Sequence, residues 1–269
     1  MAKIESTFFD IGYLDTLSYQ QSPIHRLDPR AKLIVTLVFV VAVVSFDRYE
    51  ISGLLGFFLF PVVMVSLGDL PLGYLLKKLL LVAPFAVFIG IFNPILDRQV
   101  MIVMGPLAIS GGWVSFISIL LRFGLTVTAA LILIATSSFA GVCLALERLK
   151  VPRSFAVQLL FLYRYLFVLI AETRRLLRAR TLRSFDGRGL GIKVVGSLIG
   201  HLLLRTLNRG RRIYLAMLCR GFDGEIHTMR RLKMTGWDFI FMFGWILFFI
   251  VIRNHNLPQL IGNLLTGVF

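Results

Sequence analysis

Two stretches of this sequence share one pattern of chemically active residues. ARTLRSFDG occupies residues 179–187 and AMLCRGFDG occupies residues 216–224, so that Ala, Arg, Phe, Asp and Gly coincide. The dipole of a helix favours a cation at its C-terminus, and the planar guanidinium of arginine offers a fork of donors to carboxylates or carbonyls. The glycines let a chain leave a helix in the left-handed conformation. We therefore expect Arg183 and Arg220 to end two helices as copies of one docking device.

The candidate docking residues are the alanines and arginines of this repeat, together with the small residue that follows each arginine. They are Ala179, Arg183, Ser184, Ala216, Arg220 and Gly221. Contact with anionic lipid alone explains basic helices, at about 1 kcal/mol for each basic side chain. It does not require two matching helix ends, so the repeat favours two equivalent surfaces on protein partners.

Other chemistries lack a supporting pattern. His25, His201, His227 and His255 are scattered, and Cys143 and Cys219 form neither a CxxC motif nor a His-Cys cluster. The GRGLGIK stretch at 187–193 is a helix linker rather than a phosphate loop, because no GxxxxGK[ST] motif exists. Aromatic residues are not interleaved with the basic ones for base stacking. We expect no metal site, no cofactor, no catalytic residue and no nucleic-acid partner.

Two long helices must carry the docking residues. One can run without a breaker from Ser154 to Ser184, apolar in its first half and arginine-rich in its second, and the other runs from about Val194 to Arg220. At 100° per residue, the second helix is amphipathic. Its apolar stripe is Leu203, Leu207, Gly210, Tyr214 and Met217, and its basic stripe includes Arg205, Arg209, Arg212 and Arg220.

Composition places these helices in a membrane protein. Hydrophobic residues make up 57% of the 269-residue chain, which has 24 Phe and a mean hydropathy of +0.83, so apolar surface must face lipid. The net charge of +15 is concentrated, because residues 147–233 hold 19 Lys and Arg against five acids. The charge therefore belongs to one segment and not to the whole surface.

The apolar pattern predicts an all-α polytopic membrane protein with five transmembrane helices. The expected spans are 31–46, 51–67, 76–92, 115–139 and 237–252, with a loop at 97–112 and a sixth crossing left open for the apolar tail after residue 257. Lys and Arg in the connections place the N-terminus and the basic segment in the cytoplasm. The expected regions are a cytoplasmic segment 1–30, spans within 31–140, two long basic cytoplasmic coupling helices within 141–235, and a C-terminal transmembrane region 236–269.

Three motifs together resemble a known family. The two arginine helix ends resemble the signature of the T component of energy-coupling factor (ECF) transporters. SPIHRLDPRAKL at 22–33 resembles the lead-in to the family's first membrane helix, and VPRSFAVQLLFLYRYLFVLIAE at 151–172 resembles the approach to its first coupling helix. Within the first of these, Asp28, Pro29 and Arg30 are a structural motif, since Asp28 suits an N-cap with Pro29 at the first helical position.

The branch of the family follows from two shorter stretches. RGFDGEI at 220–226 and FLYRYLFVL at 161–169 look most like the CbiQ branch, which serves cobalt uptake and cobalamin biosynthesis, with nickel and vitamin systems as alternatives. The family commonly has Ala directly before each signature arginine, whereas Leu182 and Cys219 stand there in this chain. The arginine positions match, and the packing beside them differs.

The resemblance implies a non-catalytic subunit of an ATP-driven importer in the bacterial inner membrane. Its partners would be two cytoplasmic ATPase subunits of ABC type, a membrane-embedded substrate-binding component and the lipid bilayer. Arg183 and Arg220 would each dock on one ATPase. The alternative from another class is a stand-alone secondary transporter, which would show inverted repeats and charges near the membrane midplane. Away from the ends of the predicted spans, the only charged residue is Arg122, and it lies off the centre of its span.

Overall fold

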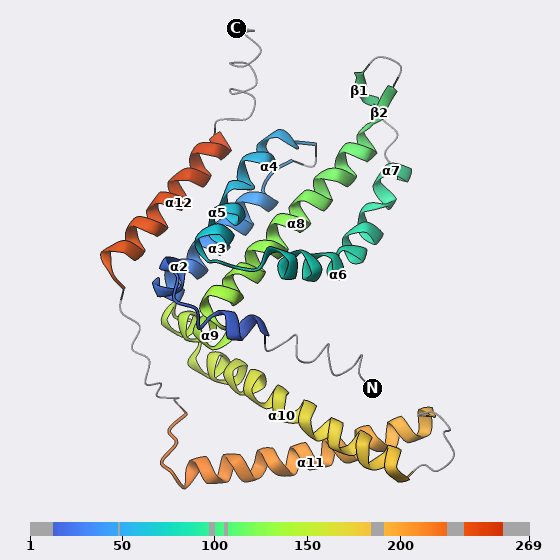
Figure 1. Cartoon of the computed structure of the whole chain (residues 1–269), viewed down its shortest axis with the longest axis vertical. Coiled ribbons are helices and arrows are strands. Elements are labelled where there is room, and N and C mark those ends of the chain that lie inside the picture. The colour runs from blue at the N-terminus through green and yellow to red at the C-terminus, as the bar shows by residue number, and fades with distance from the viewer. Residues whose placement is uncertain are drawn as a thin grey trace. The chain divides into compact units, whose positions relative to one another are not determined.

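The computed structural model describes residues 13–47, 49–96, 100–104, 107–183, 191–224 and 234–254, and it is helical apart from one small hairpin (Figure 1). The elements are α2 (Pro23–Arg26), α3 (Pro29–Val44), α4 (Ser52–Phe57), α5 (Leu59–Leu67), α6 (Leu72–Gly90), α7 (Phe92–Leu96), β1 (Val100–Met104), β2 (Leu107–Ser110), α8 (Gly111–Ser137), α9 (Phe139–Arg148), α10 (Arg153–Arg183), α11 (Ile192–Leu218) and α12 (Gly236–Asn254). The predicted all-α class is confirmed.

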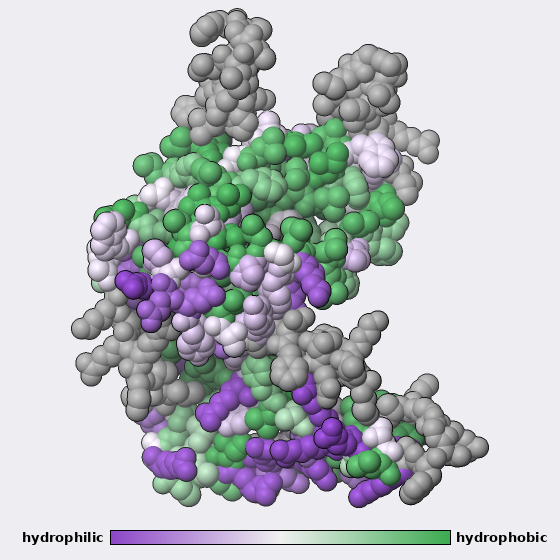
Figure 2. Space-filling view, viewed as in Figure 1, coloured by the Kyte–Doolittle hydropathy of each residue, from purple (hydrophilic) through white to green (hydrophobic). Residues whose placement is uncertain are grey.

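The chain forms two compact units, and the division falls within α9, between Val142 and Cys143. The first unit, here called the membrane bundle, contains α2 to α8, the start of α9, and α12. The second, here called the helix pair, contains α10 and α11. Figure 2 shows apolar side chains over most of the membrane bundle, whereas hydrophilic side chains gather on the helix pair.

Among the described residues, four helices are long and apolar enough to cross a membrane: Leu72–Pro94, Gly111–Ser137, Arg153–Arg183 and Gly236–Asn254. The segment Ser52–Leu67 is a shorter apolar helix. Three of these helices match predicted spans, which supports a polytopic membrane protein. The fourth, α10, was predicted as a coupling helix. It is nevertheless long and apolar enough to cross a membrane, because its first half is apolar and its cluster of arginines begins only at Arg174.

The core of the membrane bundle is built on α3, which packs against both α8 and α12. At ~1.5 Å per residue, its 16 residues span about 24 Å, short of a hydrocarbon layer of about 30 Å. Its buried face centres on Phe39, whose ring lies 4.7 Å from that of Phe60 and 5.4 Å from that of Phe249, between ring centroids. The first predicted span is therefore a helix that mainly faces protein.

The structure adds local detail to two predictions. The apolar helix Ser52–Leu67 has an irregular turn at Phe58, between the end of α4 at Phe57 and the start of α5 at Leu59. Pro61 explains the irregular turn, because proline has no N–H to donate to the carbonyl one turn earlier and its ring clashes with that carbonyl. The predicted loop at 97–112 contains the antiparallel pair β1 and β2, in which Met104 pairs with Leu107 and Val103 with Ala108.

Candidate functional site

The two helices of the helix pair are joined by one acidic side chain. Glu172 on α10 accepts a hydrogen bond from Arg205 Nη1 on α11 at 2.7 Å, and its other oxygen lies 3.9 Å from Arg175 Nη1. The Glu172 side chain is only 19% exposed, so water screens this contact less than it screens a fully exposed pair. No role was assigned to Glu172 from the sequence. Its position as the single acid in an arginine-rich helix could have indicated a contact with a basic residue.

A largely apolar groove of about 860 Å³ lies between α10 and α11. Its lining includes Phe161, Tyr165 and Leu169 from α10, and Ile213, Met217 and Phe222 from the second half of α11 and the turn after it. Residues 161–172 of α10 thus face residues 205–217 of α11, an antiparallel arrangement. The half-buried positions of α11 include Leu198, Leu202, Thr206, Ile213 and Met217.

The predicted apolar stripe of α11 therefore only partly faces α10. Met217 lies at the seam, but Leu203 and Leu207 are 57% and 61% exposed, and Tyr214 is exposed as well. The apolar surface of α11 is wider than the contact that α10 makes with it. A sequence pattern shows that a helix has an apolar stripe, but not which part of the stripe an intramolecular neighbour covers.

The C-terminal end of α11 forms a Schellman turn. The N–H of Phe222 donates to the carbonyl of Met217 at 3.1 Å, and the N–H of Gly221 donates to that of Leu218 at 3.0 Å. Gly221 has φ +77°, the left-handed conformation that this motif requires and that a residue without Cβ adopts freely. The chain therefore leaves the helix through Gly221, which aligns with Ser184 of the first repeat, while Gly224, the glycine shared by both repeats, also has a left-handed φ of +93°. Arg220, directly before the glycine, and Ala216 are exposed.

The corresponding end of α10 is described as far as Arg183, the last residue of that helix. Ala179 lies one turn earlier, and both side chains are exposed. Ser184 and the rest of the first repeat, 184–187, lie outside the described residues. Over the described part of the first repeat, an exposed arginine therefore follows an exposed alanine by one helical turn, as in the second repeat.

The pairing of the helices sets the distance between the two arginines. The helices α10 and α11 run in opposite directions (Figure 1), and Glu172 lies beside Arg205, so Arg183 and Arg220 lie at opposite ends of the pair. At ~1.5 Å per residue along each helix from this contact, the two arginines are up to about 40 Å apart. The structure does not bring them into one site but presents them as two separate ends.

The N-terminal motif caps α3. Asp28 Oδ1 accepts a hydrogen bond from the N–H of Arg30 at 2.9 Å, and Pro29 occupies the first turn, where its missing N–H costs nothing. Arg30 Nε also lies 3.8 Å from the same carboxylate oxygen. Asp28 is buried. The predicted cap is therefore present, and its function is to start α3.

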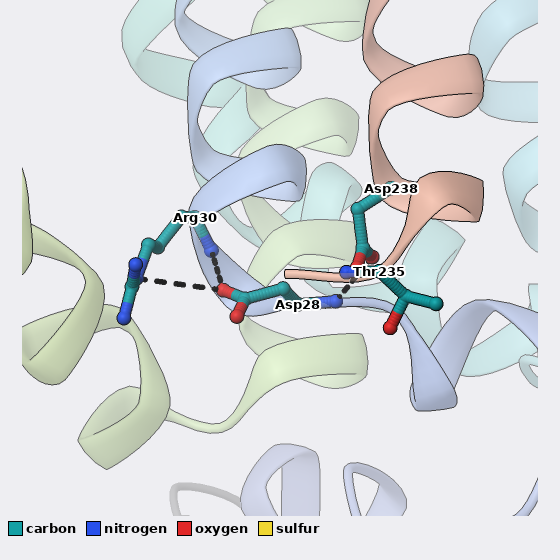
Figure 3. Close-up of polar contacts among 4 residues, drawn as sticks. All are labelled: Asp28, Arg30, Thr235 and Asp238. Atoms are coloured by element: carbon teal, nitrogen blue, oxygen red, sulfur yellow. Dashed lines mark hydrogen bonds and ion pairs between the residues drawn. The ribbon is translucent and has the colours of Figure 1, made fainter. Parts of the chain in front are cut away.

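A second buried carboxylate, which the sequence did not single out, ties this cap to the last described helix (Figure 3). Asp238 Oδ1 accepts the N–H of Asp28 at 2.7 Å, and Asp238 Oδ2 accepts the N–H of Thr235 at 2.6 Å. Asp238 is 2% exposed and lies in the first turn of α12, where a helix dipole favours a negative charge. It therefore joins the starts of α3 and α12.

His25 belongs to the same region, and its ring contacts a serine side chain. Its Nδ1 lies 2.7 Å from the hydroxyl of Ser22. Burial, and then the positive charge of Lys32, lower the pKa of His25, so that it is neutral at neutral pH. Within the part of the chain that the structure describes, no three His, Cys, Asp or Glu side chains form a group that could hold a metal ion.

Comparisons with known proteins now decide the family. The family model for CbiQ, described as a cobalt transport protein, matches residues 20–231. An ECF transporter transmembrane protein EcfT from Heliobacterium modesticaldum is 30% identical over 242 residues, covering 81% of this chain and 87% of that protein. The EcfT of Bacillus subtilis is 28% identical over 239 residues, covering 81% and 88%. The chain belongs to the CbiQ-type T components of ECF transporters.

A further relative does not carry the EcfT name. An uncharacterized protein of Methanocaldococcus jannaschii is 27% identical over 231 residues, covering 81% of this T component and 78% of that protein. The matched family region contains the Asp28 motif and both arginine helix ends. These are the same features that carried the resemblance in the sequence.

The Asp238 contacts yield a stability prediction. Asp238→Ala leaves the N–H groups of Asp28 and Thr235 without an acceptor, and each unsatisfied buried donor costs about 1–3 kcal/mol. Thermal unfolding in detergent should therefore begin at a clearly lower temperature than for the wild type. Asp238→Asn keeps one acceptor oxygen, so its unfolding temperature should lie between those of the wild type and Asp238→Ala. Equal melting of wild type and Asp238→Ala would contradict the assigned contacts.

Proposed function

We propose that this T component couples two cytoplasmic ABC-type ATPase subunits to a membrane-embedded substrate-binding component in the bacterial inner membrane. The observation that carries the proposal is the pair of exposed arginine ends at opposite ends of one antiparallel helix pair. Two separate ends of like chemistry suit two equivalent partner surfaces. A stand-alone secondary transporter has no need for such a pair, and membership of the ECF family also argues against it.

Coupling would use the helix pair as a mechanical link. Arg183 and Arg220 would each enter a groove on one ATPase, where the fork of guanidinium donors meets carboxylates or carbonyls. Closure of the ATPases on ATP would then displace α10 and α11 relative to each other. The exposed apolar surface of the helices would pass that displacement to the substrate-binding component. The chain itself would transmit force without binding nucleotide or catalysing a reaction.

We propose cobalt as the cargo, on the strength of the family description and of the stretches at 161–169 and 220–226. Nickel and vitamins stay as alternatives, because the cargo would be bound by another polypeptide. The N-terminus and the helix pair are proposed to be cytoplasmic. The strong bias of Lys and Arg toward residues 147–233 supports this orientation.

Charge reversal at the two helix ends tests the docking role. Arg183→Glu and Arg220→Glu should each severely reduce cobalt uptake, and the double variant should lose its ATPases during purification. Reversing a charge that a partner groove desolvates costs on the order of 2–5 kcal/mol, because an opposing group is left buried and unpaired. The measurements are ATPase copurification and metal uptake at matched membrane levels.

Arg178→Glu and Arg211→Glu are the matched controls. Both arginines are exposed, and they lie on the same two helices as Arg183 and Arg220 but outside the repeat. At 100° per residue, each points well away from the repeated arginine of its helix. The controls should retain the ATPases and most of the uptake. If all four variants lose function equally and modestly, the helices form only a basic membrane surface.

The two cysteines provide a test of orientation. Cys219 is exposed, whereas Cys143 is buried and its burial raises the thiol pKa to about 11. Only the thiolate reacts, so a membrane-impermeant maleimide should label Cys219 and spare Cys143 at neutral pH. Labelling is expected in inside-out vesicles that contain the chain without its partners, and it should vanish in Cys219→Ser. Labelling in right-side-out vesicles would overturn the cytoplasmic assignment.

A further inference from the structure

The turn between α8 and α9 has an unusual backbone conformation. The helix α8 ends at Ser137 and α9 begins at Phe139, so a single residue separates them. That residue, Ser138, has φ +60°, a region that side chains with Cβ rarely adopt unless their surroundings hold them there. Its hydroxyl oxygen accepts the N–H of Gly141 at 3.0 Å. The sharp change of direction is therefore held in place by specific contacts.

The first contact on this turn comes from a distant part of the chain. The N–H of Phe139 donates to Asp15 Oδ1 at 3.1 Å. A carboxylate at the N-terminus of a helix satisfies a free N–H and matches the helix dipole. The start of α9 is thus capped by a side chain that precedes it by 124 residues.

The second contact is made by a buried lysine. Lys32 on α3 is 2% exposed, and its Nζ donates to the carbonyl of Thr136 in the last turn of α8 at 2.8 Å. The last turn of α8 contains no basic residue of its own, so Lys32 supplies the cation that a helix C-terminus favours. Burying an ammonium group costs far more free energy than burying an apolar side chain. Stability alone would favour an apolar residue at this position.

The turn lies close to the point where the chain passes between the two units. The chain passes from the membrane bundle to the helix pair within α9, just after the turn. The helix α10 follows at Arg153 and ends at Arg183. Any displacement of α10 that enters the membrane bundle along this part of the chain must pass through Ser138.

We propose that Lys32, together with Asp15, is a positioning residue for energy coupling, an inference that rests on the coupling function proposed above. Lys32 holds the end of α8 on α3, and Asp15 holds the start of α9. With both contacts in place, a displacement arriving along α9 moves α8 and α3 together. Without them, the turn yields at Ser138 and the displacement is lost before it reaches the spans.

The test uses the complete transporter complex with Lys32→Met, Lys32→Arg and Asp15→Ala. Lys32→Met should raise the amide hydrogen exchange rates of Phe139 and Gly141 about tenfold or more, since losing a hydrogen bond from a charged donor destabilises the turn to that extent. Cobalt uptake per ATP hydrolysed should fall several-fold while the ATPases still copurify. Lys32→Arg keeps the cation and should restore part of the coupling. Asp15→Ala acts on the same turn from a half-exposed position, in case Lys32→Met folds poorly.

Thr36→Val is the control. Thr36 is buried one turn further along α3, and its hydroxyl donates to the carbonyl of Lys32 within that helix at 2.8 Å, without touching the turn. Thr36→Val should leave the amide hydrogen exchange rate of Phe139 and the cobalt uptake per ATP hydrolysed unchanged. Unchanged exchange in both Lys32→Met and Asp15→Ala, or faster exchange with normal uptake per ATP, would overturn the inference. Absence of ATPases from the wild-type complex would instead contradict the proposed function, and the exchange rates would still decide whether Lys32 holds the turn.

Discussion

The antiparallel pairing of α10 with α11 controls where the repeated arginines lie. Glu172 joins the helices at Arg205, and the apolar groove extends the contact toward the end of α11. Parallel helices would place both arginines at one end, where a single partner surface could take them. The antiparallel pair separates them by up to about 40 Å, at ~1.5 Å per residue. The proposed attachment to two ATPases depends on this separation.

Buried polar contacts between distant parts of the chain organise the membrane bundle in a comparable way. Asp238 joins the starts of α12 and α3, and Lys32 joins α3 to the end of α8. Apolar packing around Phe39 forms the core, but packing of this kind is not directional. The hydrogen bonds fix how the helix ends are placed, because each has a required donor, acceptor and geometry. Within the segment from Asp15 to Lys32, Asp28 therefore caps α3, while Asp15 and Lys32 hold the α8–α9 turn.

Features encoded in short windows were predictable from the sequence. The long helices, the cap at Asp28 and the left-handed Gly221 each follow from neighbouring residues, and so does the repeat around Arg183 and Arg220. Asp238 and Lys32 were not assigned, because their partners lie 210 and 104 residues away. The part of the apolar stripe of α11 that faces α10 could not be predicted either. The apolar residues of α11 cover more of the helix than one neighbour buries, and only the packed structure decides which of them are covered.

Photo-crosslinking at the two helix ends tests the central claim most directly. A photoreactive amino acid placed at Arg183, at Arg220 and at the control position Arg211 would be activated in cells that express the whole transporter. The account predicts that positions 183 and 220 each crosslink to an ATPase subunit, in separate products, and that position 211 does not. Crosslinks from both ends to lipid alone, or equal ATPase crosslinking from position 211, would contradict it.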